Sequence, residues 1–319
     1  LLRGDESAGP DLKSGIQRDW LDDLGGLESL QAVYEWAQRH GDGETQRWAG
    51  GRIERVAHDY SSSLQPARAL PLLLQADRLP VGDNQGLQAA AAAFAYGLAS
   101  DAKAMEIRPS LTLARHVQPQ RPEGAAWLCK RAARALLEWR QLLPEQQDGQ
   151  PRLWLAEHEA DLRRCIGLLI DLGRLGEAEQ MLGVLREEEL HEFRRRSRGP
   201  VRVGPRAVSL GLTPDELQRN GRLQPLQQRL RQEALAARQR ADAHPEQRLR
   251  RGLDDPESEA LLRTATQDLQ AISLQPGPVT AGTRAQTSGV AARLPAGHAR
   301  LTFALGTGLQ CDAWALVET

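Results

Sequence analysis

The apolar residues between positions 161 and 195 recur every three or four residues, which is the spacing of one face of an α-helix. They form two runs, separated by Gly173. Because glycine readily adopts the left-handed conformation that ends a helix, Gly173 predicts a turn between two antiparallel helices. The two runs consist of Leu162, Ile166, Leu169 and Leu172, and then of Leu175, Ala178, Leu182, Leu185 and Leu190.

The same periodicity extends through the preceding part of the chain. Turn residues such as Gly41-Asp42-Gly43 and Gly82-Asp83-Asn84, together with Pro119 and Pro122, separate one apolar segment from the next. Successive helices at intervals suited to pairs are typical of an α-solenoid. The predicted helical segments are residues 20–40, 48–60, 64–74, 87–98, 102–117, 125–143 and 153–172.

A strong helix-start signal follows at Thr213-Pro214-Asp215-Glu216. Thr213 is a suitable N-cap, Pro214 suits the first helical position, and Glu216 can return a hydrogen bond to the cap. Asp255-Pro256 starts a second helix, so residues 213–274 predict an antiparallel helical hairpin or short coiled coil. Its apolar seams are Leu217, Leu223, Leu226, Leu230 and Ala237 on one helix, and Leu262, Ala265, Leu269 and Ile272 on the other.

The pattern changes at the C-terminal end. Residues 275–293 are rich in Pro, Gly, Thr and Ser and indicate a linker. Apolar residues then alternate with others at 301–305, the turn Gly306-Thr307-Gly308 follows, and 311–317 form a second short run. This pattern predicts a β-hairpin, which needs further strands or helices for stability, so we expect it to open a truncated domain of a longer protein.

Composition limits the classes of partner. The 319 residues carry 41 basic and 42 acidic side chains, and this balance provides no field that would attract nucleic acid or an anionic membrane. The arginine-rich segment 194–206 could bind phosphates, but a solvated linker explains it better. The longest apolar run, 87–98, is too short to span a bilayer. The preference for arginine over lysine indicates a GC-rich genome and hence a bacterial source.

No catalytic, cofactor-binding or metal-binding residue can be assigned from local motifs. Cys129, Cys165 and Cys311 are widely spaced, which indicates neither a disulfide framework nor a zinc knuckle and favours a reducing cytoplasm. His158-Glu159 resembles the start of a zinc motif, but position 162 is leucine. We therefore expect Cys165 to be a packing residue and His158 a surface histidine. His191, in the acidic run 187–192, indicates a solvated helix face or part of a partner groove.

The helical hairpin resembles a tetratricopeptide repeat. Gly173, Leu175, Ala178, Leu182 and Leu185 stand at the offsets of the turn glycine, the packing positions and the small alanine of that repeat. An ordinary amphipathic hairpin in an all-helical protein is the alternative. A small residue at position 178 suits a close crossing of the two helices.

Four stretches in order resemble the CHAT proteins, which join a caspase-like domain to tetratricopeptide repeats. They are LLIDLGRLGEA from Leu168, LREEELHEFR from Leu185, LGLTPDE from Leu210 and LPAGHARLTFALGTGLQCDAWALVET from Leu294. The resemblance implies a cysteine endopeptidase fold with a His-Cys dyad. His298 precedes the first predicted strand and Cys311 lies on the second, so neither matches the dyad.

These observations predict a mainly α protein with a defined order of parts. We expect tetratricopeptide-like repeats at 1–196, a linker at 197–212, a helical hairpin at 213–274, a linker at 275–293 and the first strands of an α/β caspase-like domain at 294–319. The predicted function is the protein-interaction and regulatory region of a cytoplasmic CHAT-type protease, with a protein partner or activator on the repeat surface. A non-enzymatic helical-repeat adaptor is the alternative.

Overall fold

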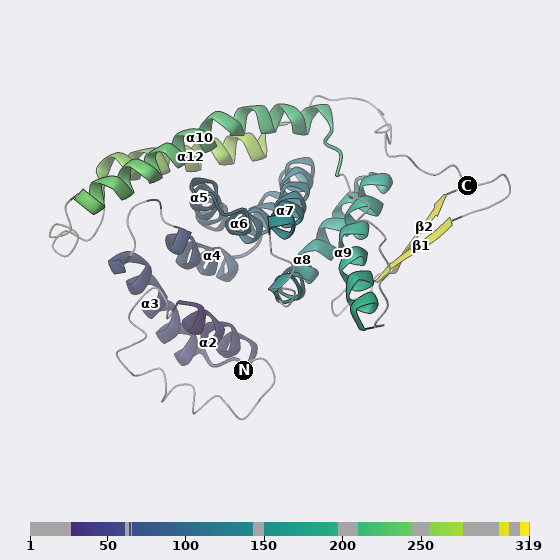
Figure 1. Ribbon diagram of the computed structural model, residues 1–319, viewed down its shortest axis with the longest axis horizontal. Coiled ribbons are helices and arrows are strands. Elements are labelled where there is room, and N and C mark those ends of the chain that lie inside the picture. Colours follow the sequence, from purple (N-terminus) through teal and green to yellow (C-terminus); the bar gives the residue numbers. More distant parts are fainter. Residues whose placement is uncertain are drawn as a thin grey trace. The chain divides into compact units, whose positions relative to one another are not determined.

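The computed structural model is mainly helical, as the sequence predicts (Figure 1). Its residues form two compact units. Unit 1 contains Leu1–Asp101 with Leu223–Gln270, and unit 2 contains Ala102–Arg222 with Ala271–Thr319. The structure describes residues 27–60, 64, 66–142, 150–196, 210–243, 255–276, 300–305 and 313–318.

In unit 1, turns at predicted glycines separate consecutive helices. Gly41 and Gly82 have φ angles of +68° and +85°, in the left-handed region that glycine adopts without a steric penalty. The Asp83 side chain accepts hydrogen bonds from the backbone N–H groups of Gln85, at 2.7 Å, and Gly86, at 3.0 Å. The first elements are α2 (Leu27–Arg39), α3 (Gly43–Tyr60), the 3₁₀ turn η4 (Pro66–Arg68), α4 (Ala69–Arg78) and α5 (Asn84–Ala99).

Each of these helices packs against the next one in the sequence, α2 on α3, α3 on α4 and α4 on α5. Tyr34 lies in the core that α2, α3 and α4 form, and its hydroxyl accepts a 2.5 Å hydrogen bond from Nε of Arg78. Alanines make up half of the buried residues of α5, and their small side chains permit close helix packing. The buried residues of this core are Leu27, Leu30, Val33, Tyr34, Ala49, Ile53, Val56 and Leu74.

Unit 2 is built on two helical pairs. The pairs are α6 (Ala104–Val117) with α7 (Pro122–Leu142), and α8 (Gln150–Asp171) with α9 (Leu175–Arg196). Helix α7 also contacts α8 and α9, and α6 contacts α8. Pro122 is the first residue of α7, so the helix begins three residues before the predicted start at 125, with proline at the first helical position that suits it.

Gly173 ends α8 in the way the sequence predicts. Its φ angle is +69°, and its N–H donates to the carbonyl oxygen of Ile170 at 2.8 Å. The next N–H, of Arg174, reaches back to Leu169, also at 2.8 Å, which completes a Schellman motif. Leu175, predicted as a core residue, is 43% exposed, so that prediction was wrong. Leu175 is the first residue of α9, beside the turn, and the first buried apolar side chain of this helix is that of Ala178.

Helices α10 (Pro214–Ala243) and α12 (Pro256–Leu274) start at the two predicted prolines and contribute residues to both units. Leu217, predicted for the apolar seam of α10, is 57% exposed, because the buried side of these first turns is formed by Glu216 and Arg219 instead. The predicted seam residues that are buried are Leu223, Leu226, Leu230, Ala237, Ala265, Leu269 and Ile272.

Within unit 2, arginine side chains cap the C-terminal end of α12. Arg219, only 1% exposed, donates hydrogen bonds to the carbonyl oxygens of Ile272, Ser273 and Gln275, at 2.6, 3.2 and 2.8 Å. Nε of Arg121 donates to the carbonyl oxygen of Leu274 at 3.0 Å. These bonds satisfy carbonyl groups that have no partner within the helix, and the positive charges oppose the negative end of its dipole.

Gly124, in the first turn of α7, allows the capped end of α12 to approach closely. A Cβ atom at this position would overlap the backbone carbonyl oxygen of Ser273, which cannot rotate away as a side chain could. We expect Gly124→Ala to lower the free energy of unfolding by about 1–3 kcal/mol, the usual cost of overpacking. Urea unfolding of the full chain measures this change.

Gly221→Ala is the matched control for Gly124→Ala. Gly221 lies in α10, is exposed, and has no atom within 4 Å of an added Cβ. Alanine should stabilise the helix there by about 0.5–1 kcal/mol, because glycine loses more backbone entropy on folding. Equal effects of the two substitutions would contradict the close approach at Gly124.

The described part of the chain ends with two antiparallel strands, β1 (Arg300–Leu305) and β2 (Ala313–Glu318), with Arg300 opposite Glu318. Several predicted features lie outside the described residues or concern side chains that are not described, and the predicted domain boundaries remain predictions. These features are the turn at 306–308, residues 277–293 of the predicted 275–293 linker, most of the arginine-rich segment, His298, Cys311, and the side chains of His191 and the 187–192 run. None of the helices described is both long and apolar enough to cross a membrane.

Candidate functional site

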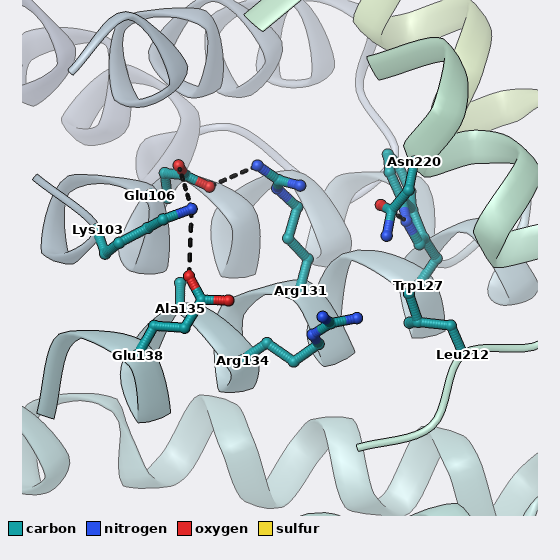
Figure 2. A pocket seen from close by; sticks show the side chains of 9 residues that line it. All are labelled: Lys103, Glu106, Trp127, Arg131, Arg134, Ala135, Glu138, Leu212 and Asn220. Atoms are coloured by element: carbon teal, nitrogen blue, oxygen red, sulfur yellow. Dashed lines mark hydrogen bonds and ion pairs between the residues drawn. The ribbon is translucent and has the colours of Figure 1, made fainter. Parts of the chain in front are cut away.

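A surface pocket in unit 2 lies against one face of α7 (Figure 2). Five of its residues lie on α7 at spacings of three, four or one, so that one side of this helix forms the pocket floor. Lys103 and Glu106 come from the start of α6, and Leu212 and Asn220 come from the start of α10 and the residues before it. The α7 residues are Trp127, Arg131, Arg134, Ala135 and Glu138.

Ion pairs neutralise most of the charge at one end of the pocket. The Glu106 carboxylate is 1% exposed and lies 2.6 Å from Nη2 of Arg131 and 3.5 Å from Nζ of Lys103. The same lysine lies 3.3 Å from Glu138, whose side chain is 47% exposed at the rim. A buried carboxylate with cationic neighbours therefore lines this end of the pocket (Figure 2).

The other end of the pocket is partly apolar. The indole N–H of Trp127 donates a 2.9 Å hydrogen bond to Oδ1 of Asn220, so that both polar groups are satisfied there. Arg134 extends toward the side lined by Trp127 and Leu212, and no hydrogen bond or ion pair joins it to another residue drawn in the pocket (Figure 2). This half-buried guanidinium is available to an anion.

A second charged group lies on another side of α7. Lys130 is fully buried and donates hydrogen bonds to the carboxylates of Glu177, on α9, and Glu216, on α10, the latter at 2.6 Å. Arg174 contacts the same two carboxylates at 2.5 Å each. Two cations and two anions therefore balance inside the protein, and they join three helices.

Burial alone would raise the pKa of Glu177, but hydrogen bonds from Arg174 and Lys130 outweigh it and lower the pKa below the usual range. Glu216 also completes the predicted capping box. Its Oε2 accepts from the N–H of Thr213 at 2.9 Å, and Thr213 Oγ1 accepts from the N–H of Glu216 at 3.3 Å. The capping box is thus confirmed, and its glutamate also belongs to the buried ion network.

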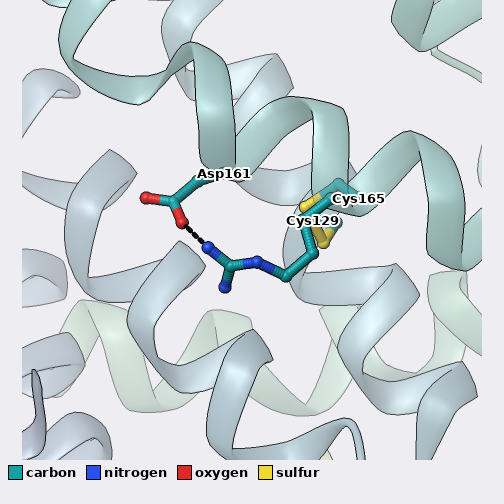
Figure 3. Close-up of a disulfide and its surroundings, with 4 residues drawn as sticks. Cys129, Asp161 and Cys165 are labelled. Carbon is teal, nitrogen blue, oxygen red and sulfur yellow. Dashed lines mark hydrogen bonds and ion pairs between the residues drawn. A yellow bond between two sulfur atoms is a disulfide. The ribbon is translucent and has the colours of Figure 1, made fainter. Parts of the chain in front are cut away.

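A disulfide joins Cys129 of α7 to Cys165 of α8 (Figure 3). The sequence-based expectation that the cysteines indicate no disulfide was therefore wrong. The two cysteines are 36 positions apart and show no pattern in the sequence, but the packing of α7 on α8 places their Cα atoms 5.7 Å apart, within the normal range for a disulfide. Nearby on α8, Asp161 forms an ion pair with Arg164 (Figure 3).

The prediction that His158 is a surface histidine was also wrong, since its side chain is 2% exposed. Burial lowers its pKa from 6.5 to about 4; Asp161 opposes this shift and Arg108 adds to it. Within the described ranges, no group of three His, Cys, Asp or Glu side chains is placed to hold a metal ion.

We expect His158 to make the protein less stable in acid. Because its pKa is about 4 when folded and 6.5 when unfolded, the unfolded state takes up the proton first as the pH falls. The stability contributed by the neutral imidazole is complete above pH 6.5 and decreases by about 3 kcal/mol as the pH falls to 4. His158→Gln should remove this component, as measured by urea unfolding at several pH values.

The exposed His58 is the control for this measurement. His58→Gln makes the same substitution at an exposed position and so reports the effect of the substitution itself. If His158→Gln behaves in the same way, the buried neutral histidine is not the source of the acid sensitivity.

Sequence analysis did not identify the pocket or the ion network. One residue could have indicated the ion network from the sequence. Lys130 lies in a run of residues that are buried in α7, namely Trp127, Leu128, Cys129, Ala132 and Ala133. A buried ammonium needs carboxylate partners. These partners come from Glu177 and Glu216, which are distant in the sequence, so the pattern could not name them.

Comparison of the chain with protein-family models, with curated proteins and with solved structures found no match.

Proposed function

We propose that this chain is a protein-interaction and regulatory region built from stacked helical pairs, and that it belongs to a CHAT-type caspase-like cysteine protease to which it contributes no catalytic residue. The proposal has two parts. The interaction function rests on the helical pairs of unit 2 and their pocket, and the protease connection rests on the sequence resemblance alone.

The contacts among four helices of unit 2 support the proposed interaction function. Helices α6 and α7 form one pair, α8 and α9 form the next, and α7 contacts both helices of the following pair. These contacts support the proposal, because in an α-solenoid each helical pair contacts the next and side chains from successive helices share a continuous surface. Protein binding is the function that such surfaces most often serve.

The residues that line the pocket also support the interaction function. It combines an aromatic residue, an apolar residue and charged side chains at a partly exposed site on α7, and interaction surfaces are enriched in tryptophan and arginine. Among the described residues of this unit, the exposed Leu175 and Leu217 add apolar surface outside the pocket. The buried ion network, by contrast, holds helices together and has no access to a ligand.

Site-specific photocrosslinking tests the interaction. A benzoylphenylalanine residue placed at Glu138, on the pocket rim, should capture a defined protein in cells of the source organism, and the purified partner should bind the chain in solution. The same residue at Val81 of unit 1, which is 53% exposed, is the control. No capture at Glu138, or the same set of proteins captured at both positions, would reject the interaction function.

The coding frame beyond Thr319 tests the protease part. CHAT-type proteins carry the histidine in a His-Gly context and the cysteine after a small residue, so strands ending in these motifs should follow. A stop codon directly after Thr319 would instead favour a non-enzymatic helical-repeat adaptor, which keeps the interaction function and loses the protease connection.

A further inference from the structure

We infer that the pocket on α7 binds the side-chain carboxylate of an acidic residue in a protein partner, and that Arg134 is the group that receives it. The inference rests on the proposed interaction function and names the chemistry of the partner at that site.

The side chains that line the pocket carry a net charge of +1. Lys103, Arg131 and Arg134 carry three positive charges, and Glu106 and Glu138 carry two negative charges. The first two cations pair with the glutamates, at distances of 2.6–3.5 Å, and Arg134 pairs with no other residue of the pocket. One monoanion therefore neutralises the pocket.

Arg134 is suited to a carboxylate by its shape. A guanidinium donates two parallel N–H bonds to the two oxygens of a carboxylate, and a partly buried site strengthens this interaction by limiting competition from water. Arg134 is half-buried and extends toward Trp127 and Leu212 (Figure 2). A bound carboxylate would therefore have its methylene groups against the indole ring and the leucine side chain.

The polar groups beside Arg134, those of Trp127 and Asn220, favour a side-chain carboxylate as the ligand over the terminal carboxylate of a peptide. A terminal carboxylate brings the last backbone amide with it, and this amide needs a hydrogen-bond partner when it is buried. The amide oxygen of Asn220 already accepts from Trp127. A glutamate or aspartate side chain brings only apolar methylene groups into the same space.

The two glutamates of the lining disfavour a phosphate group. A phosphate monoester carries up to two negative charges near neutral pH, so it would exceed the single surplus charge and repel the carboxylates of Glu106 and Glu138. Sites for phosphate groups normally present several cations without adjacent carboxylates. The pocket thus discriminates by charge between a carboxylate and a phosphate.

Titration followed by NMR tests the inference with small probes. The indole N–H resonance of Trp127, identified among the seven tryptophans by Trp127→Phe, reports on the pocket. N-acetylglutamate N-methylamide should shift this resonance in a saturable way. The neutral glutamine analogue, N-acetylalanine with its terminal carboxylate, and inorganic phosphate should each bind at least about tenfold more weakly.

Arg134→Gln should weaken binding of the glutamate probe about tenfold while the circular dichroism and thermal midpoint stay unchanged. Arg164→Gln is the matched control, because Arg164 is an exposed arginine of the same unit and pairs with Asp161 on α8. It should leave the binding of the probe as it is in the wild type. Equal loss in both variants would indicate a general charge effect and overturn the inference.

The remaining outcomes separate the inference from the proposed function. Tighter binding of phosphate, of N-acetylalanine or of the glutamine analogue would overturn the assignment of the ligand. If the crosslinked partner binds the Arg134→Gln variant as tightly as the wild type, the inference fails and the interaction function stands. If the glutamate probe binds through Arg134 but no partner is captured, the pocket chemistry stands and the proposed function fails.

Discussion

Replacing Lys130 with methionine is expected to lower the free energy of unfolding by about 3–5 kcal/mol, the usual cost of removing one partner from a buried ion pair. Lys130 is fully buried, and its loss leaves Glu177 and Glu216 with Arg174 as their shared cation. An uncompensated negative charge inside the protein is then poorly solvated. Urea unfolding of the full chain at pH 7.5 measures the change.

Two comparisons make this prediction specific. Lys103→Met removes a lysine whose side chain is 29% exposed, and we expect a loss of only about 0–1 kcal/mol. Adding Glu177→Gln to Lys130→Met restores the charge balance with Arg174 and Glu216, so the double variant should be more stable than the sum of the single losses predicts. Additive losses would show that the groups do not act as one network.

Breaking the disulfide is expected to cost about 4 kcal/mol. The bond closes a loop between Cys129 and Cys165, which are 36 positions apart, and a loop of this length restricts the unfolded chain by that amount in the chain-entropy model. The double variant Cys129→Ala/Cys165→Ala should unfold at a lower urea concentration than the oxidised wild type. Both cysteines lie in the core, so alanine introduces no unsatisfied polar group.

A reducing agent provides the control for the disulfide. Dithiothreitol should lower the stability of the wild type toward that of the double variant and leave the double variant unchanged. Alkylation of the denatured, unreduced wild type should modify Cys311 and neither of the two paired cysteines. Alkylation of Cys129 or Cys165 under these conditions would contradict the bond.

Local signals in the sequence predicted the helix ends well. Pro122, Pro214 and Pro256 begin helices, and Gly173 ends one, because proline and glycine restrict or free the backbone whatever the tertiary context. Where side chains are described, buried positions such as Leu162, Ile166 and Leu169 of α8 also follow the apolar spacing. Errors occurred at the first turns of α9 and α10, where Leu175 and Leu217 are exposed.

The pocket and the disulfide depend on contacts that no local pattern contains. Cys129 and Cys165 become neighbours only because α7 packs on α8, and Lys130 meets Glu216 only because α10 starts beside α7. A spacing rule applies within one helix, so it cannot align side chains across three of them. The same limit explains why His158 was predicted to lie at the surface.

Each unit is made of two separate segments of the chain, and this affects the order in which the units are completed during synthesis. Unit 1 consists of Leu1–Asp101 and Leu223–Gln270, so the ribosome makes residues 102–222 of unit 2 before it makes the rest of unit 1. Residues 27–99 are therefore synthesised well before residues 223–270, which complete their unit. A truncation at any single position between 101 and 223 would remove part of both units, so isolating unit 1 requires both an internal deletion of residues 102–222 and a stop after Gln270.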